Sequence, residues 1–103
     1  MKGQKTKKDI DLLTDRQLVS WFMMSSYAYY SLGKPLMEDI TFDHLVQRLK
    51  ECYDKVDHIH KKHITKQHLE AGTGYDIDYP SMVKGATIYY LKESGLWSLY
   101  LDQ

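Results

Sequence analysis

Two carboxylates and three aromatic rings lie close together in the sequence, on either side of a Gly-Lys-Pro turn. They belong to Tyr29, Tyr30, Asp39, Phe42 and Asp43. The face of an aromatic ring attracts a flat cation through its quadrupole. An ionised carboxylate complements the same positive charge and accepts hydrogen bonds from hydroxyl or amide groups. These residue types at this spacing indicate a binding site for a ring-shaped ligand or a partner. The alternative interpretation is a well-built turn in which the same side chains only cap and close a helical hairpin.

The turn between these residues carries its own signals. Gly33 can adopt a positive φ, and Pro35 has a fixed φ and prevents the preceding helix from continuing. Asp39 is the expected N-cap of the next helix, and Asp43 then lies one turn further on, near the positive end of the helix dipole. The turn is therefore predicted to bring rings from the incoming helix and acids from the outgoing helix to one corner.

Two helices are predicted to form this corner. Thr14 and Gln17 have the spacing of a capping box, which predicts a helix from about residue 15 to residue 32. Its apolar arc is wide, so we expect it to be covered on more than one side. A second helix is predicted from about residue 40 to beyond residue 58, because its apolar residues recur with a clean helical period. The short connection favours an antiparallel hairpin over about residues 15 to 60.

The other segments are predicted to complete a mostly α-helical fold with a single small domain. We expect residues 1–9 to be a flexible basic tail and residues 10–103 to form the helical domain. After a loop over residues 71–80, a third packed helix is predicted over about residues 81 to 92. Residues 96–101 suggest a short strand or a closing turn. The inward face of the third helix is expected to consist of Met82, Gly85, Ala86, Tyr89 and Tyr90.

The composition limits the classes of function. The 103 residues include 14 basic and 14 acidic side chains, so the charge is balanced and binding to nucleic acid through bulk charge is disfavoured. The single cysteine, Cys52, cannot support an internal disulfide framework; it fits a reducing compartment and is expected to be a buried, inert thiol. No apolar run approaches the length of a membrane span. We expect a cytoplasmic protein of a bacterium or a phage-infected host.

The stretch Tyr-Tyr-x-Leu-Gly-x-Pro-x-x-x-Asp-x-x-Phe-Asp-x-Leu, over residues 29–45, resembles the N-terminal Ia domain of bacterial NAD-dependent DNA ligases. That family carries Tyr-His, a short turn containing Pro, and Asp-x-x-Tyr-Asp-x-Leu on the next helix. In the family this domain closes over the adenylation domain and holds the nicotinamide mononucleotide (NMN) half of NAD. The resemblance covers about residues 19 to 56 and implies NAD or NMN as the ligand.

The resemblance assigns a place to each of the five residues. Tyr29 matches the first tyrosine of the family, and Asp39 and Asp43 match its two aspartates. Tyr30 stands where the family has histidine, so the imidazole is lost. Phe42 stands where the family has its second tyrosine, so the ring is kept and the hydroxyl is lost. An oxidised nicotinamide ring is a flat cation of the kind that this set of side chains would attract.

The catalytic parts of a ligase are missing from the sequence. In that family adenylyl transfer uses a lysine in a Lys-x-Asp-Gly motif, and the nearest match here, residues 92–95, lacks the aspartate. The chain is also too short for the nucleotidyltransferase, OB-fold and helix-hairpin-helix domains. We therefore expect no catalytic residue and no enzyme activity, and at most a freestanding module related to the Ia domain.

A histidine-rich stretch over residues 58–68 offers a second candidate site. Lysines between the histidines oppose a metal cation, and no His-Glu-x-x-His pattern is present, so no metal ligands are predicted. A solvated, charged face is the simplest interpretation. The alternative is a phosphate-binding patch formed by His60, Lys61, Lys62, His63 and Lys66.

Three functions follow from these patterns. The leading hypothesis is a non-catalytic NMN- or NAD-binding module that is an accessory to a separate ligase polypeptide. The second is a small phage-type interaction or inhibitor protein that reuses the same scaffold to bind a protein partner. The third is a nucleic-acid accessory protein that uses the lysines and histidines of residues 58–68. No membrane partner is expected.

Overall fold

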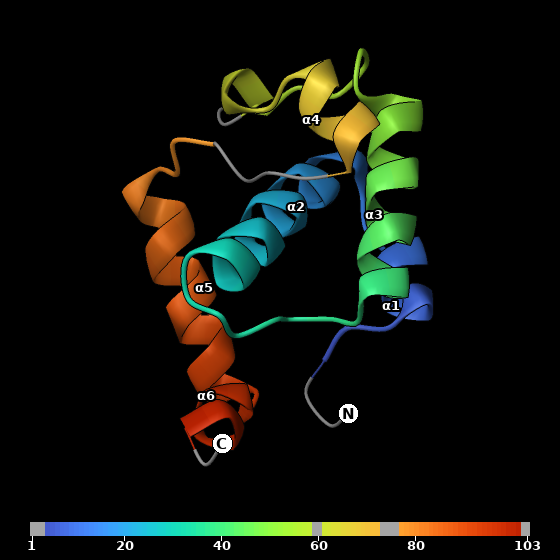
Figure 1. The fold of residues 1–103 in the computed structure, drawn as a ribbon. Helices are drawn as coiled ribbons and strands as arrows, with labels where there is room; N and C mark the ends of the chain where they lie inside the picture. The colour runs from blue at the N-terminus through green and yellow to red at the C-terminus, as the bar shows by residue number, and fades with distance from the viewer. Residues whose placement is uncertain (1–3, 59–60, 73–76, 102–103) are drawn as a thin grey trace.

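The computed structural model describes residues 4–58, 61–72 and 77–101. This part of the chain folds into six α-helices and one 3-10 turn, and its single β-bridge, between Lys5 and Met37, belongs to no strand (Figure 1). The predicted mostly α-helical, single-domain fold is confirmed. In chain order the helices are α1 (Lys7–Asp11), α2 (Asp15–Tyr30), α3 (Asp39–Cys52), α4 (Lys66–Ala71), α5 (Ser81–Glu93) and α6 (Leu96–Leu101), with the 3-10 turn at Lys61–His63 before α4.

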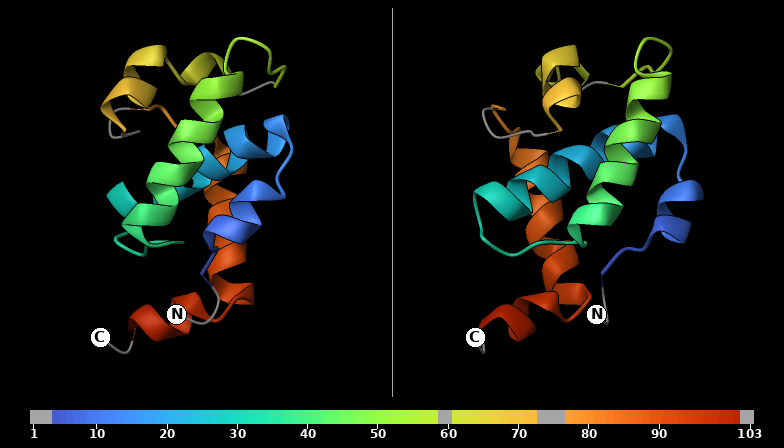
Figure 2. Two further views of the ribbon diagram at one scale, coloured as in Figure 1. Left: turned by 90° about the vertical axis from the view of Figure 1, so that its right-hand side faces the viewer. Right: turned by 45° about the vertical axis from the view of Figure 1, so that its right-hand side comes forward.

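Helix α2 is the centre of the molecule. It packs against α3 on one side and against α5 on the other, and Figures 1 and 2 show it between these two helices. The capping box predicted at its start is present, because Thr14 accepts from the backbone of Gln17 and Gln17 accepts from the backbone of Thr14. Burial on both sides explains the wide apolar arc of its sequence.

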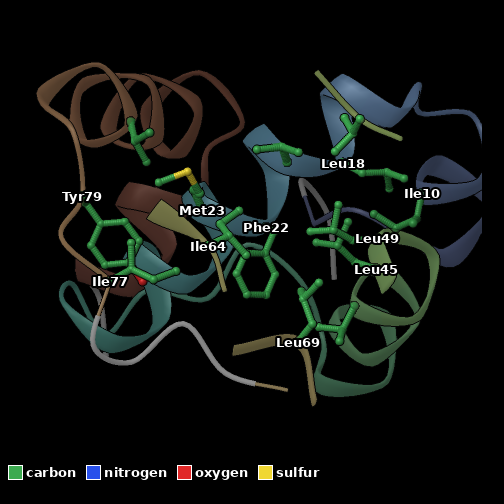
Figure 3. Close-up of a cluster of buried hydrophobic side chains, with 14 of the residues drawn as sticks. Ile10, Leu18, Phe22, Met23, Leu45, Leu49, Ile64, Leu69, Ile77 and Tyr79 are labelled. Carbon is green, nitrogen blue, oxygen red and sulfur yellow. The ribbon is translucent and has the colours of Figure 1, made fainter. Parts of the chain in front are cut away.

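The buried side chains form two clusters. In the larger one, Phe22 of α2 lies among Leu45 and Leu49 of α3 and Ile64 and Leu69 from the region of α4 (Figure 3). The smaller cluster lies where α2 ends and consists of Ala28, Leu36, Leu91 and Leu96. It joins the α2–α3 connection to α5 and α6.

The N-terminal segment differs from the expected flexible tail. Residues 1–3 lie outside the described part, but Thr6 caps α1 in a capping box with Asp9. The backbone N–H of Lys5 donates to the carbonyl of Leu36 at 3.2 Å, and Ile10 is fully buried. This segment therefore packs on the α2–α3 connection.

The ends and faces of the later helices also differ in part from prediction. Helix α3 is shorter than expected and ends at Cys52. Residues 96–101 form a helix where a strand or a closing turn was predicted. The inward face of α5 was predicted wrongly for four of its five residues: the buried positions are Val83, Thr87 and Leu91. Met82, Gly85, Ala86 and Tyr89 are exposed, and Tyr90 is half-buried.

No helix in the described part of the chain is long and apolar enough to cross a lipid bilayer.

Candidate ligand-binding cleft

A cleft of about 310 Å³ lies at the corner between α2 and α3. Tyr29, Tyr30, Asp39, Phe42 and Asp43 all line it. The five residues singled out from the sequence are thus brought together in one hollow. The remaining lining comes from Ser25 and Ser26 of α2, from Pro35, Leu36 and Met37 of the connection, and from Gly72 at the end of α4.

The aromatic wall of the cleft combines exposed rings with a supported one. Tyr29 and Tyr30 pack edge to face with their ring centroids 4.8 Å apart, and they are 50% and 39% exposed. Phe42 is half-buried and stacks on the fully buried Phe22, with centroids 5.7 Å apart and planes 21° from parallel. Phe42 is therefore fixed by the core, whereas the two tyrosines present their surfaces to solvent.

The two carboxylates of the cleft are available to a ligand. The prediction that Asp39 caps α3 is wrong: Glu38 is the N-cap, and it makes no side-chain capping bond. Asp39 and Asp43 lie one turn apart in the first half of α3, and both are exposed. Within the described residues neither carboxylate forms an ion pair or a side-chain hydrogen bond. Both acids therefore keep their full capacity to accept hydrogen bonds.

The connection that forms the third wall is held by its own turn and by α6. Gly33 has a φ of 64°, as predicted, and the backbone N–H of Lys34 donates to the carbonyl of Ala28 at 2.9 Å. The Tyr100 hydroxyl donates to the carbonyl of Pro35 at 2.7 Å. The Lys34 ammonium lies 4.9 Å from the centre of the Trp97 ring. The wall is thus fixed by contacts to the C-terminal helix.

Sequence reasoning missed six of the lining residues, and two of these, Ser25 and Ser26, carry hydroxyl groups. Both are buried, and they precede Tyr29 and Tyr30 by four residues, one helical turn. This spacing is the signal that would have found them. The Ser25 hydroxyl lies 4.0 Å from the sulfur of Met37, and the Ser26 Oγ has no hydrogen-bond partner within the described residues.

The candidate phosphate patch lies away from the cleft, and part of its charge is already engaged. The Lys61 ammonium lies 4.8 Å from the centre of the Tyr53 ring, and Lys66 pairs with Asp54 at 3.1 Å. Lys62 is exposed and His63 is half-buried. His60 lies outside the described residues. The patch therefore presents less positive charge than its sequence suggests.

Cys52 does not extend the chemistry of the cleft. It is half-buried, and its thiol donates to the carbonyl of Leu49 at 3.6 Å. Burial raises the pKa of the Cys52 thiol, and the nearby carboxylate of Asp15 raises it further. The protonated thiol is a poor nucleophile at neutral pH. In the described part of the chain, no three His, Cys, Asp or Glu side chains gather where they could share a metal ion.

Comparison of the chain with protein-family models, with curated proteins and with solved structures gives no match.

Proposed function

We propose that the cleft binds the NMN half of NAD and that the chain is a non-catalytic accessory to a NAD-dependent DNA ligase. One observation carries the proposal: the five positions to which the Ia resemblance assigns ligand contact all line one cleft of about 310 Å³. They come from two helices joined by a turn, and their assembly into one hollow supports the proposal.

Each part of the ligand has a counterpart in the cleft. The rings of Tyr29, Tyr30 and Phe42 offer faces and edges to the nicotinamide ring. Asp39 and Asp43 complement its positive charge and accept hydrogen bonds from the ribose hydroxyls. No lysine or arginine is among the described residues that line the cleft. The phosphate of NMN would therefore point away from the two acids, out of the cleft and toward the ligase partner.

Isothermal titration calorimetry with NMN and NAD tests the binding. We expect heat of binding with the wild type, and at least about fivefold weaker binding for Asp39→Ala and for Asp43→Ala, since each removes one charged acceptor. Glu51→Ala is the matched control, because Glu51 is an exposed acid at the far end of the same helix. A wild-type protein that stays silent at millimolar nucleotide would refute the proposal.

The accessory role needs its own experiment. A NAD-dependent ligase from which the Ia domain has been deleted is mixed with this chain, and the adenylated ligase is measured. We expect adenylation to recover with the wild-type chain and to remain low with Asp39→Ala. If the chain binds NMN but never restores adenylation, the proposal of NMN binding stands and the accessory role is rejected.

One observation favours the second candidate, a protein-binding role. The outward face of α5 carries Met82, 69% exposed, and Tyr89, 58% exposed, with the exposed small residues Gly85 and Ala86 between them. Exposed apolar side chains in a row are typical of protein contact surfaces. The change Met82→Glu introduces a negative charge on this face; it would abolish binding to such a partner and leave NMN binding unchanged, which separates the two functions.

A further inference from the structure

The hydroxyl of Ser26 is an unsatisfied polar group in the wall of the cleft. Ser26 is fully buried, and its Oγ has no hydrogen-bond partner in the described part of the molecule. A serine within a helix commonly returns its hydroxyl to the carbonyl four residues earlier, but this bond is absent here. Nearly all buried polar groups in proteins have a partner, and an unpaired one is destabilising. Within the described residues, the hydrogen-bonding capacity of this hydroxyl is therefore unused and open to a ligand in the cleft.

A second weakly satisfied hydroxyl lies beside it. Ser25 is 4% exposed, and its contact with the Met37 sulfur is long at 4.0 Å. A thioether sulfur is a weak acceptor, so this contact is given up at little cost. Both serines line the same cleft as the rings and the acids. The wall thus contains two adjacent hydroxyls, one poorly paired and one with no partner among the residues that the structure describes.

We propose that Ser26, supported by Ser25, is the specificity-determining residue that binds the carboxamide of a nicotinamide-type ring. This inference rests on the proposed function and names the part of the ligand that the cleft distinguishes. A carboxamide is both donor and acceptor, as is a serine hydroxyl. The serines lie one helical turn, about 5.4 Å, below Tyr29 and Tyr30. That rise suits a planar ring that contacts the tyrosines and carries its amide toward the serines.

The covered position of the Oγ does not prevent this contact. The Oγ is covered by its neighbours in the structure. The hydroxyl reorients among staggered positions by rotation about the single Cα–Cβ bond, without any movement of α2. Ser26 lines the cleft, so a ligand that offers a hydrogen bond there would stabilise the orientation in which the Oγ meets it. A ligand without such a group leaves the hydroxyl unpaired and binds more weakly.

Two small cations test the proposal on the full chain: 1-methylnicotinamide, and 1-methylpyridinium, which lacks the carboxamide. By calorimetry we expect the wild type to bind 1-methylnicotinamide about five- to tenfold more tightly. Ser26→Ala should remove this preference and leave the affinity for 1-methylpyridinium unchanged. Ser98→Ala, an exposed serine on α6, is the matched control and should keep the wild-type preference.

The outcomes separate this inference from the function on which it rests. Equal affinity of the wild type for both cations overturns the role of Ser26 and leaves a cleft that binds flat cations. A Ser26→Ala variant that keeps the full preference for 1-methylnicotinamide also overturns the role of Ser26. If neither cation nor NMN binds, both the cleft function and this inference fail. Ser26→Ala should fold normally, since no internal hydrogen bond is lost; if it does not, Ser26→Cys, with its weakly donating thiol, takes its place and must lose most of the preference.

Discussion

Asp39 contributes to the cleft because its neighbour occupies the capping position. Glu38 is the N-cap of α3, so Asp39 lies inside the first turn, and its carboxylate has no partner among residues 4–58, 61–72 and 77–101. Asp43, one turn further on, shares that condition. The presence of both acids at the cleft was predictable from their residue type and their spacing. The one-residue register of the cap was not, because Glu38 and Asp39 are both acidic and only the backbone geometry of the turn decides between them.

Substitution of the phenyl ring at position 42 tests the Ia resemblance directly. Phe42→Tyr restores the hydroxyl that the family carries, and the half-buried ring at the cleft leaves room for a polar tip. We expect this variant to bind NMN about three- to tenfold more tightly than the wild type, because one hydrogen bond is added. Calorimetry measures the affinity.

Phe22→Tyr, a change in the buried partner of the same stacked pair, is the control for that experiment, and it should lower the stability of the fold without raising affinity. Unchanged or weaker NMN binding by Phe42→Tyr would show that NMN does not lie in the cleft in the orientation that the Ia resemblance implies.

Among the elements, α6 has the clearest connection to the cleft. Its Tyr100 hydroxyl donates to the carbonyl of Pro35 and accepts from the Gln4 amide at 3.2 Å. Leu96 packs with Leu36 in the smaller buried cluster. Helix α6 therefore holds both the backbone and a side chain of the connection that forms one wall.

The variant Tyr100→Phe tests this support. It keeps the ring and removes both hydrogen bonds, so we expect the free energy of unfolding to fall by about 1 to 2 kcal/mol. NMN binding should weaken at the same time, because the wall at Pro35 is less firmly placed. Urea denaturation measures the first effect and calorimetry the second.

Tyr89→Phe removes a hydroxyl from an exposed ring on α5 and should change neither quantity. Equal stability of Tyr100→Phe and the wild type would show that the α6 contact contributes nothing to the wall.

For the whole molecule, the long helices were predictable and the short ones were not. Helices α2, α3 and α5 have enough residues for a periodic apolar pattern to stand out, and α2 also begins with a capping box. Helices α1 and α6 have five and six residues, too few to show a period, and they depend on packing against the rest of the chain. The face of α5 was predicted wrongly because both of its faces carry apolar residues, and sequence does not decide which one meets α2.

Acidity should loosen the packing of α1. Hydrogen bonds from the backbone N–H and the hydroxyl of Thr6, at 2.9 and 3.0 Å, hold the pKa of the Asp9 carboxyl below its ordinary value. A lowered pKa stabilises the fold above the pKa of the unfolded chain, and this stabilisation is lost as the pH falls through the folded pKa. We expect Asp9→Asn to be less stable than the wild type at pH 7, and the difference to shrink as the pH falls below about 4 and to vanish below the folded pKa of Asp9.

Thermal unfolding of the two proteins across this pH range measures that difference. Asp57→Asn, at an exposed acid after α3, is the control. A difference in stability between Asp9→Asn and the wild type that persists unchanged at low pH would show that the charge of Asp9 does not stabilise α1.

The contact between Tyr100 and Pro35 joins residues that are 65 positions apart. During synthesis on the ribosome, α2, the turn and α3 emerge long before α6 does. The nascent chain can form its early helices at once, but one side of the cleft lacks its support until α6 has left the exit tunnel. A translation product that stops before α6 would therefore contain every ring and acid of the cleft and still bind the proposed ligand poorly.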